Sequence, residues 1–579
     1  MLRQLREERR YTILFLILLF CYGMYSLSRI YGFSIFPDEF GYWSYAAKVA
    51  GYDWSDIVSM GSYYSYGYSL ILIPIFMLIE DAVTAYRIAV MVNFALLAFA
   101  FLVLIKLSEK LLGENVEPTK LVIFAAIAVF YPSWLFYAQM TLTEIVLMAM
   151  YVFICALLYD YVENKRLPIL ILFILALVYI YMVHMRSVAV VIAGVMALGY
   201  YFFSEKVNWK LVLGVLAVGA VLLLGAVFIK NAVSGVLYAD AQMDSYQVND
   251  YGGQIGKLRY ILTLEGLKDF CVSLGGKLLY MSMATYGTAY WGIGHIIGCL
   301  WRDRRDKAER RSARSVLYIF ALLATVGQLL ITTIFNVVPG RIDSLTYGRY
   351  HEFTFTILMV IGLAAMIKAK RLWLPTLVIA LIQLPVIPMV MYGIEKYQLI
   401  DFQGYFMVGM SYAHGIFGYQ QDTYYWMAYG VGVVLTVLVA GGVAIMRRKH
   451  ALEPVLIVLL VVELALAIRS CAIYSDIYNG RAYQDKQLIA KLEQLASEDR
   501  DIIYIDDGGM PIIGILQFMK RDADIRIIPQ KASIEEYSVE ERDENDLLIV
   551  DIVSGFREQL DESYDREYSV GHFSLYYND

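Results

Sequence analysis

The chain has 579 residues, of which 59% are hydrophobic and only 18% are charged, and its mean hydropathy is +0.56. These values exclude an ordinary soluble domain and predict a polytopic membrane protein. The net charge is -6, and the basic residues gather in short loops. We therefore predict no basic face for nucleic acid and no nucleic-acid partner.

Cysteine and histidine are few and scattered. The five cysteines lie mostly inside apolar runs without C-x-x-C spacing, and the six histidines form no H-x-x-x-H pair. We expect no disulfide framework and no built-in transition-metal centre. The first apolar run, 11–35, is too long for a signal-peptide core and no small-residue cleavage site follows it, so it is expected to remain as an anchor.

Apolar runs long enough to cross a bilayer as helices recur along the chain. A span needs about 20 such residues, and on this basis we count about thirteen spans. They are expected near 11–34, 84–106, 120–137, 145–160, 167–183, 187–203, 210–229, 277–300, 315–336, 353–367, 373–392, 425–446 and 453–469. The fold class is therefore mainly α, a multi-pass transmembrane helical bundle in a cell membrane.

The distribution of Lys and Arg predicts the orientation of this bundle. Four arginines precede the first span, so the N-terminus should be cytoplasmic. An odd number of spans then places the C-terminal domain outside the cytoplasm. Each expected inner loop is basic, with Lys106/Lys110, Lys165/Arg166, Lys206/Lys210, Arg302 to Lys307, Lys368/Lys370/Arg371 and Arg447/Arg448/Lys449.

Asp38 and Glu39 follow the first span directly after Pro37. Because proline suits the first position of a helix, both carboxylates should lie in a first helical turn, where free N–H groups favour negative charge. The pair should stay ionised near pH 7. Beside the rings of Tyr42 and Trp43, such a carboxylate could take a proton from a hydroxyl group of a sugar or lipid. An ordinary acidic first turn explains the same residues without chemistry.

Two long outer loops are expected, at 35–83 and 230–276. The first contains Tyr66 and then an apolar run, 69–79, that is too short to cross the membrane. We interpret this run as an interfacial or re-entrant helix that returns towards Asp38. The second loop is polar and rich in tyrosine, and it should carry short surface helices.

Further charged and aromatic residues lie at the outer ends of the expected spans. Arginines there run against the positive-inside bias and need partners. Structural Glu–Arg ion pairs would satisfy them, but an arginine at membrane depth can also bind a lipid-linked phosphate through two parallel N–H groups. The residues are Glu144, His184, Arg186, Arg341, Arg349, Tyr350 and His351.

The composition changes after the last span, and we place a domain boundary there, between a membrane module at 1–470 and a soluble domain at 471–579. The pattern predicts helices at 487–496 and 511–520, strands at 501–506, 525–528 and 547–550, and a closing hairpin at 568–577. This is a small α/β domain of about 100 residues.

Several of these features together resemble the C-type-fold (GT-C) membrane glycosyltransferases, in particular the protein O-mannosyltransferases and the lipid A aminoarabinose transferases. They are Asp38-Glu39, the short apolar segment that ends before Tyr86-Arg87, Glu144 at the start of a span, and Arg349-Tyr350 late in the bundle. The resemblance covers roughly 11–469. The chain departs from it at Tyr66-Gly67-Tyr68-Ser69-Leu70, where relatives often carry a Tyr-Pro-Pro-Leu segment, and at Glu144-Ile145, where many have Asp-Pro or Glu-Pro.

The resemblance implies an inverting glycosyltransferase that moves a hexose or pentose from a polyprenyl-phosphate donor to a glycan, lipid or protein acceptor on the outer face. Asp38 would be the general base, and Glu39 would support it. No cofactor is required by this chemistry, although two carboxylates could hold Mg²⁺ or Mn²⁺. The expected substrate-binding residues are Tyr42, Tyr66, Glu144, His184, Arg186, Arg341, Arg349 and Tyr350.

Two other classes of function remain open from the sequence. A polytopic transporter or lipid flippase should place ionisable groups in the middle of its spans. Only Glu463, near the middle of the last expected span, fits that pattern. A non-catalytic sensor would use the soluble tail as its ligand module. Charges that cluster at one face favour the enzyme, whereas charges through the core favour transport.

Overall fold

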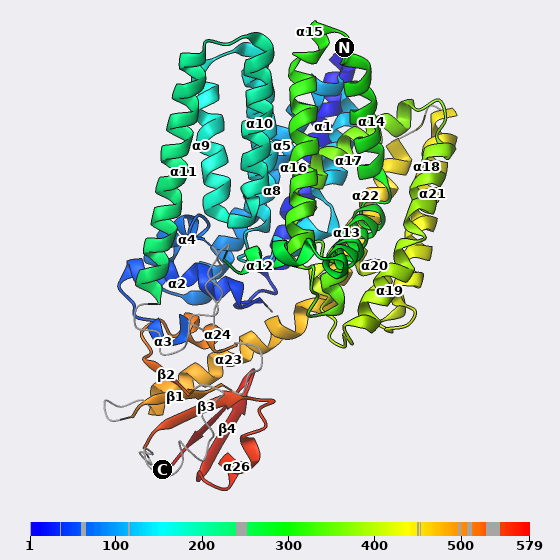
Figure 1. Ribbon diagram of the computed structural model, residues 1–579. Helices are drawn as coiled ribbons and strands as arrows, with labels where there is room; N and C mark the ends of the chain where they lie inside the picture. Colours follow the sequence, from blue (N-terminus) through cyan, green and yellow to red (C-terminus); the bar gives the residue numbers. More distant parts are fainter. Residues whose placement is uncertain are drawn as a thin grey trace.

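The computed structural model describes residues 2–34, 36–58, 65–113, 116–238, 252–448, 451, 453–495, 500–506, 512–528 and 545–578. Long helices stand side by side in a bundle, and a small mixed sheet lies beyond one end of it (Figure 1). The N-terminus lies at the opposite end, beside α15 (Lys307–Arg310). The mainly α fold class with a small C-terminal α/β unit is confirmed.

The helices of the bundle account for most of the chain. In chain order they are α1 (Leu2–Leu27), α2 (Asp38–Ala50), α3 (Ser55–Val58), α4 (Ser69–Leu78), α5 (Ala82–Leu112), α6 (Pro118–Val129), α7 (Pro132–Tyr137), α8 (Glu144–Asn164), α9 (Leu167–Val183), η1 (Met185–Ser187), α10 (Val188–Glu205), α11 (Trp209–Leu237), α12 (Gly252–Ile261), α13 (Leu264–Ala284), α14 (Thr288–Asp303), α15, α16 (Ala313–Phe335), η2 (Ile342–Thr346), η3 (Glu352–Thr354), α17 (Phe355–Lys368), α18 (Trp373–Gln383), α19 (Val386–Lys396), η4 (Gly404–Phe406), η5 (Val408–Met410), α20 (Ser411–Phe417), α21 (Tyr424–Arg448) and α22 (Glu453–Tyr474).

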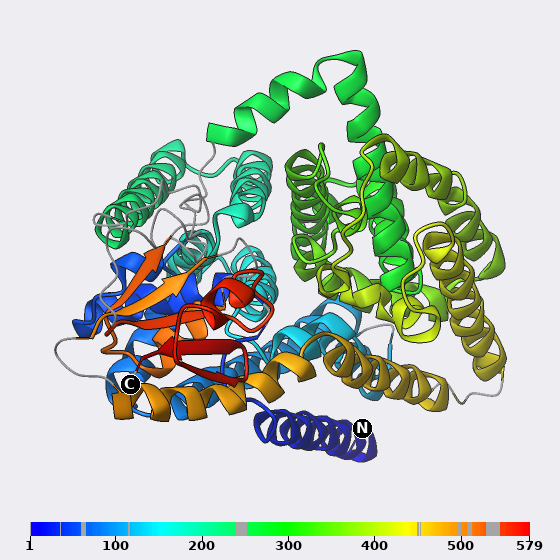
Figure 2. The ribbon, with the colours of Figure 1, turned by 90° about the horizontal axis from the view of Figure 1, so that it is seen from below.

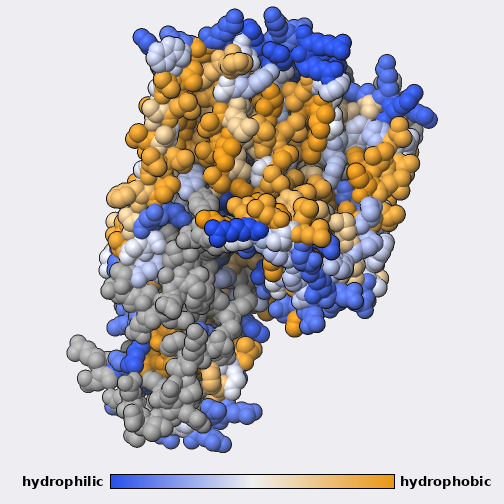
Figure 3. All heavy atoms as spheres, in the orientation of Figure 1, coloured by the Kyte–Doolittle hydropathy of each residue, from blue (hydrophilic) through white to orange (hydrophobic). Residues whose placement is uncertain are grey.

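Nine helical segments of the described chain are long and apolar enough to cross a membrane. Shorter apolar helices, α6 and α9, occupy two more of the expected spans. On the face shown in Figure 3, an apolar band crosses the bundle between hydrophilic ends. Because burying about 20 apolar residues in lipid is what holds such helices in place, the chain is a multi-pass membrane protein.

Three of the expected single spans are divided in two. The span expected at 277–300 is α13 and α14, which meet at Tyr286 and Gly287, whose φ angles are 50° and 75°. Pro132 separates α6 from α7, and Pro385 separates α18 from α19. Proline and positive φ both end a helix. A hydropathy pattern does not register these breaks, because the residues on both sides stay apolar.

Side-chain caps fix several helix ends. Asp81 accepts a hydrogen bond from the backbone N–H of Thr84 at 2.8 Å, and Thr263 accepts one from that of Gly266 at 3.0 Å. Such caps satisfy N–H groups that the first turn leaves free. Gly51 ends α2 with a φ of 93°. A left-handed residue at this position favours glycine.

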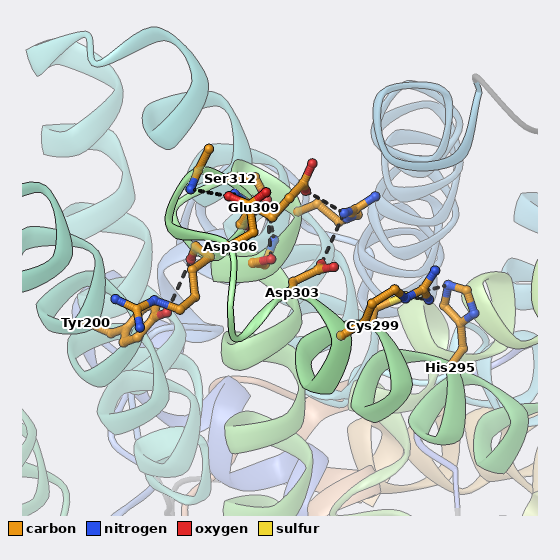
Figure 4. Close-up of polar contacts among 12 residues, drawn as sticks. Tyr200, His295, Cys299, Asp303, Asp306, Glu309 and Ser312 are labelled. Carbon is orange, nitrogen blue, oxygen red and sulfur yellow. Dashed lines mark hydrogen bonds and ion pairs between the residues drawn. The ribbon is translucent and has the colours of Figure 1, made fainter.

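Polar side chains tie together the end of the bundle that carries the N-terminus (Figure 4). Arg314 contacts Asp303 at 3.1 Å and Glu309 at 2.8 Å, and the Tyr200 hydroxyl donates to the backbone oxygen of Arg310 at 3.2 Å. This network fixes the basic connection between α14 and α16. The basic residues that were expected in one inner loop thus lie at the N-terminal end of the bundle.

The C-terminal unit is built on α23 (Asp476–Leu495), α24 (Ile513–Met519), α26 (Arg557–Asp561) and five strands. The strands are β1 (Ile502–Ile505), β2 (Ile525–Ile528), β3 (Leu547–Asp551), β4 (Arg566–Val570) and β5 (Phe573–Tyr577), in the order β2-β1-β3-β5-β4. β1 is parallel to β2 and β3, whereas β5 is antiparallel to β3 and β4. All side chains of β1 and β3 are buried. The strands expected from the sequence are therefore present.

Seen from the side of this sheet, the helices form two groups that α12 and the start of α13 connect (Figure 2). The sheet and α24 lie against the group that contains α2. Within that group, α4 packs against α2, and Ser69 donates a hydrogen bond to the backbone oxygen of Tyr42 at 2.8 Å. The short apolar helix thus returns to the Asp38 segment, as expected. The described part of the second expected outer loop, 230–276, contains the end of α11, all of α12 and the first part of α13, whereas residues 239–251 lie outside the described residues.

Candidate active site

Four charged side chains from distant parts of the sequence form one buried chain of ion pairs. The guanidinium of Arg349 lies 2.8 Å from Asp38 Oδ2 and 2.7 Å from Glu144 Oε1. Arg186 contacts the same Glu144 oxygen at 2.7 Å. All four residues are less than 9% exposed. Because buried charges are costly unless they are paired, this chain of ion pairs fixes α2, α8, η1 and the 347–350 turn relative to one another.

The turn that carries Arg349 is held by backbone bonds and a close contact. The N–H groups of Gly348 and Arg349 donate to the backbone oxygen of Phe406 at 3.0 and 3.1 Å. A Cβ atom on Gly348 would lie 2.1 Å from the ring of Tyr280, so only glycine fits there. Arg349 also stacks on Phe36, with 4.7 Å from Cζ to the ring centroid. The guanidinium is thus aimed at Asp38 from a rigid support.

Arg186 keeps unused hydrogen-bonding capacity. Its Nε and Nη1 are buried and have no hydrogen-bond partner in the part of the chain that the structure describes. Its guanidinium lies 4.4 Å from the centroid of Tyr350, and its backbone N–H donates to Nδ1 of His184 at 3.2 Å. Lys230 is also close, with its Nζ 3.5 Å from the sulfur of Met185. Arg186, Arg349 and Lys230 thus bring three cationic side chains to this region.

Glu39 is adjacent to Asp38 but has a different environment. Its carboxylate accepts hydrogen bonds from the backbone and hydroxyl of Ser34, the backbone and hydroxyl of Thr141, and the hydroxyl of Tyr86. Burial raises the pKa of this carboxyl above its usual range, although the hydrogen bonds oppose that shift. Both oxygens are committed, so Glu39 ties the start of α2 to α5 and to the 141 region.

Three tyrosines were expected at the site: Tyr350 lies against the guanidinium of Arg186, Tyr42 lies near Asp38 and Glu144, and Tyr66 packs in another cluster. Burial and the nearby carboxylates of Asp38 and Glu144 raise the pKa of Tyr42, so its hydroxyl stays protonated. Tyr66 instead packs in a separate apolar cluster with Val58, Val233 and Leu237. Tyr42 and Tyr66 both belong to the outer loop expected at 35–83, so the sequence alone could not show which of them lies beside Asp38.

Arg341 shares an aromatic neighbour, Phe406, with Arg349. Its guanidinium and that of Arg349 are 4.8 and 5.6 Å from the centroid of Phe406. Arg341 pairs with the buried carboxylate of Asp343 at 3.3 Å, and its own side chain is 32% exposed. It therefore borders the site without joining the chain of ion pairs.

The residues present do not fit a cation shared by Asp38 and Glu39. Glu39 has no uncommitted oxygen, and Asp38 is engaged by an arginine. Among the described residues no group of three or more His, Cys, Asp or Glu side chains is placed to hold a metal ion. The reaction steps proposed below therefore involve neither Mg²⁺ nor Mn²⁺.

A second buried polar group lies next to the ion pairs and was not expected as a site. Burial raises the pKa of Glu352 to about 7, and the nearby charge of Glu144 adds to this shift. The hydroxyls of Ser133, Tyr131 and Tyr280 face the carboxyl and lower its pKa in part. Glu352 follows His351 directly in sequence, and only the packing of the chain reveals its surroundings. Glu463, the ionisable residue expected near the middle of the last span, is buried in α22.

Comparisons with known proteins identify the fold. No protein-family model matches the sequence, and no curated protein matches it. The solved structure of ArnT from Cupriavidus metallidurans in the apo state is similar over 98% of both chains, with a TM-score of 0.52 and 12% identity. The structure of the same ArnT bound to undecaprenyl phosphate is similar over 97% of both chains, with the same TM-score and identity. The chain therefore shares the C-type (GT-C) glycosyltransferase fold of ArnT.

Proposed function

We propose that this protein is an integral membrane glycosyltransferase that moves a sugar from a polyprenyl-phosphate donor to an acceptor hydroxyl. The observation that carries the proposal is the buried chain Asp38–Arg349–Glu144–Arg186 in a fold shared with ArnT. The four side chains of this chain of ion pairs lie together beside α2, at the end of the bundle that faces the sheet (Figure 1). That clustering favours an enzyme over a transporter, which would distribute them through the core.

Asp38 is the proposed general base. Its Oδ2 is held by Arg349, whereas no hydrogen bond engages Oδ1 within the described chain. In the proposed step the acceptor oxygen attacks the anomeric carbon, and its proton passes to Asp38 Oδ1. The bond from the anomeric carbon to the phosphate oxygen breaks at the same time, so that polyprenyl phosphate leaves and the configuration inverts.

Arg186 is the best candidate for the donor phosphate. Its Nε and Nη1 have no hydrogen-bond partner among the described residues, and Lys230 lies nearby, with its Nζ 3.5 Å from the sulfur of Met185. An arginine fork suits two phosphate oxygens, because its N–H groups are parallel and always charged. Arg349, which is engaged by two carboxylates, would orient Asp38 and stabilise the leaving group. Glu39, whose two carboxylate oxygens both accept hydrogen bonds, would hold α2, the helix that carries Asp38, in place.

The proposed orientation places the N-terminus in the cytoplasm and the sheet outside. The positive-inside bias supports it, because the connection between α14 and α16, which lies at the N-terminal end of the bundle (Figure 1), contains Arg302, Arg304 and Arg314. A polyprenyl-phosphate sugar and its acceptor would then meet on the outer face of the membrane.

Arg186→Ala tests the phosphate contact in purified protein. We expect at least a tenfold loss of affinity for undecaprenyl phosphate, measured by native mass spectrometry, because charge-assisted hydrogen bonds worth about 1.5–3 kcal/mol each disappear. Arg314→Ala, whose ion pairs with Asp303 and Glu309 lie at the opposite end of the bundle, is the control and should bind normally. Equal affinity in Arg186→Ala and wild type would overturn this assignment.

The test of the function itself uses a panel of polyprenyl-phosphate sugars with the wild-type protein in nanodiscs. Release of polyprenyl phosphate that depends on an added acceptor is the expected result. Undecaprenyl phosphate that moves between leaflets without any sugar transfer would instead support the flippase alternative.

A further inference from the structure

The C-terminal unit inserts one aromatic side chain beneath the helix that carries Asp38. Phe518, at the end of α24, is 1% exposed and stacks on Phe33 at 4.6 Å between centroids. The same ring lies 4.9 Å from Trp43 and 6.3 Å from Tyr86. A residue of the C-terminal unit therefore packs among aromatic rings of the N-terminal part of the chain, Phe33, Trp43 and Tyr86.

The rings that Phe518 touches belong to the hydrogen-bond network of Glu39. Tyr86 donates its hydroxyl directly to Glu39. Trp43 donates from Nε1 to the hydroxyl of Thr141 at 3.0 Å, and that hydroxyl donates to Glu39 at 2.6 Å. Because Glu39 is the neighbour of Asp38 in the first turn of α2, a shift of either ring is transmitted to the proposed base.

Further contacts hold α24 in this position. Arg521 donates to the backbone oxygen of Phe76 in α4 at 2.9 Å, and its own backbone oxygen accepts from Nε1 of Trp54 at 2.9 Å. Its guanidinium lies 3.8 Å from the centroid of Phe76. Gly514 faces Phe40, and a Cβ there would approach that ring to 2.8 Å. Because the two helices are closely packed, a displacement of α24 should also displace α2.

We propose that Phe518 is a positioning residue, and that the α/β unit serves the reaction by holding α2, and with it Asp38, in line with Arg349. Phe518 does not touch the reacting atoms. It acts through Trp43 and Tyr86 on the start of α2. This role rests on the proposed function, because it assigns the purpose of the contact to the alignment of the base.

The test compares Phe518→Ala with Leu560→Ala in the full-length protein. Leu560 lies in the separate apolar cluster on the other face of the sheet, with Ile503 and Val550, so its truncation weakens the same unit without touching α2. Phe518→Ala should lower kcat by about ten- to a hundredfold, since a misplacement near 1 Å is enough for such a loss. The affinity for undecaprenyl phosphate should change less than about twofold, and Phe518→Leu should restore most of kcat.

A second variant keeps the test valid if Phe518→Ala does not fold. Gly514→Ala pushes α24 away from Phe40 without removing the Phe518 ring, and it should lower kcat in the same way. A normal kcat in both Gly514→Ala and Phe518→Ala, or an equal loss in Leu560→Ala, would overturn the proposal. An equal loss would show that the unit only needs to be folded.

Hydrogen exchange separates this proposal from the proposed function. In Phe518→Ala the amides of α2, Asp38–Ala50, should exchange faster than in wild type and in Leu560→Ala. This readout needs no sugar donor, so it remains informative if the protein transfers no sugar. Unchanged exchange in α2 would remove the positioning role whatever the activity.

Discussion

Arg349→Ala removes the guanidinium that pairs with both Asp38 and Glu144. The resulting loss in the free energy of unfolding follows from these contacts. Arg349 donates to Asp38 at 2.8 Å and to Glu144 at 2.7 Å, and its side chain is 3% exposed. Each charge-assisted bond is worth about 1.5–3 kcal/mol, and removal of one partner from a buried pair typically costs about 3–5 kcal/mol. We expect a loss of about 3–5 kcal/mol in the free energy of unfolding.

Arg314→Ala is the matched control for this change. Arg314 also joins two carboxylates, Asp303 and Glu309, at the opposite end of the bundle, but its side chain is 38% exposed. Exposed pairs contribute only about 0–1 kcal/mol because water and salt screen them. The assay is unfolding of both variants by SDS titration in mixed micelles. A cost for Arg349→Ala no larger than that for Arg314→Ala would refute the reasoning from burial.

Three other predictions follow from the same geometry. Because burial raises the pKa of Glu352 to about 7, the folded state favours the protonated form, and its stability should fall as the pH rises from about 4.5 through 7. Between pH 5 and 8 the free energy of unfolding of the wild type should fall by on the order of 2 kcal/mol relative to that of Glu352→Gln, measured by thermal unfolding in detergent. If the stabilities of the two proteins changed in parallel with pH, the prediction would be contradicted. Gly348→Ala should cost about 1–3 kcal/mol or more and lower the transfer rate, because its Cβ would meet Tyr280 at 2.1 Å; an unchanged unfolding midpoint would count against the tight turn. Reporter fusions within 302–314 and at the C-terminus should label opposite sides of the membrane, and labelling of both from one side would contradict the orientation.

Much of the architecture could be predicted because it depends on local composition. Apolar length identified most membrane helices, and alternating or continuous apolar runs identified β1, β2 and β3. The breaks at Tyr286 and Pro385 could not be read from hydropathy, because the surrounding residues are apolar on both sides. Helix breaks depend on backbone geometry, which average hydropathy does not contain.

The sequence could predict which charged residues belong to the candidate site, but not which of them form ion pairs with one another. The excess of charge at span ends pointed to Asp38, Glu144, Arg186 and Arg349, and all four meet. The partner of each residue depends on packing across the bundle, which no local pattern records. The same limit explains why the separate position of Tyr66 and the contact of Phe518 with α2 became visible only in three dimensions.

The most direct test of the central claim is the transfer rate of Asp38→Asn in purified, well-folded protein. This change keeps the size of the side chain and removes its basicity. If Asp38 takes the proton of the acceptor, the turnover should fall by about 10²- to 10⁴-fold, while the affinity for undecaprenyl phosphate stays near that of the wild type. An Asp38→Asn protein that transfers sugar at nearly the wild-type rate would contradict the assignment of Asp38 as the base.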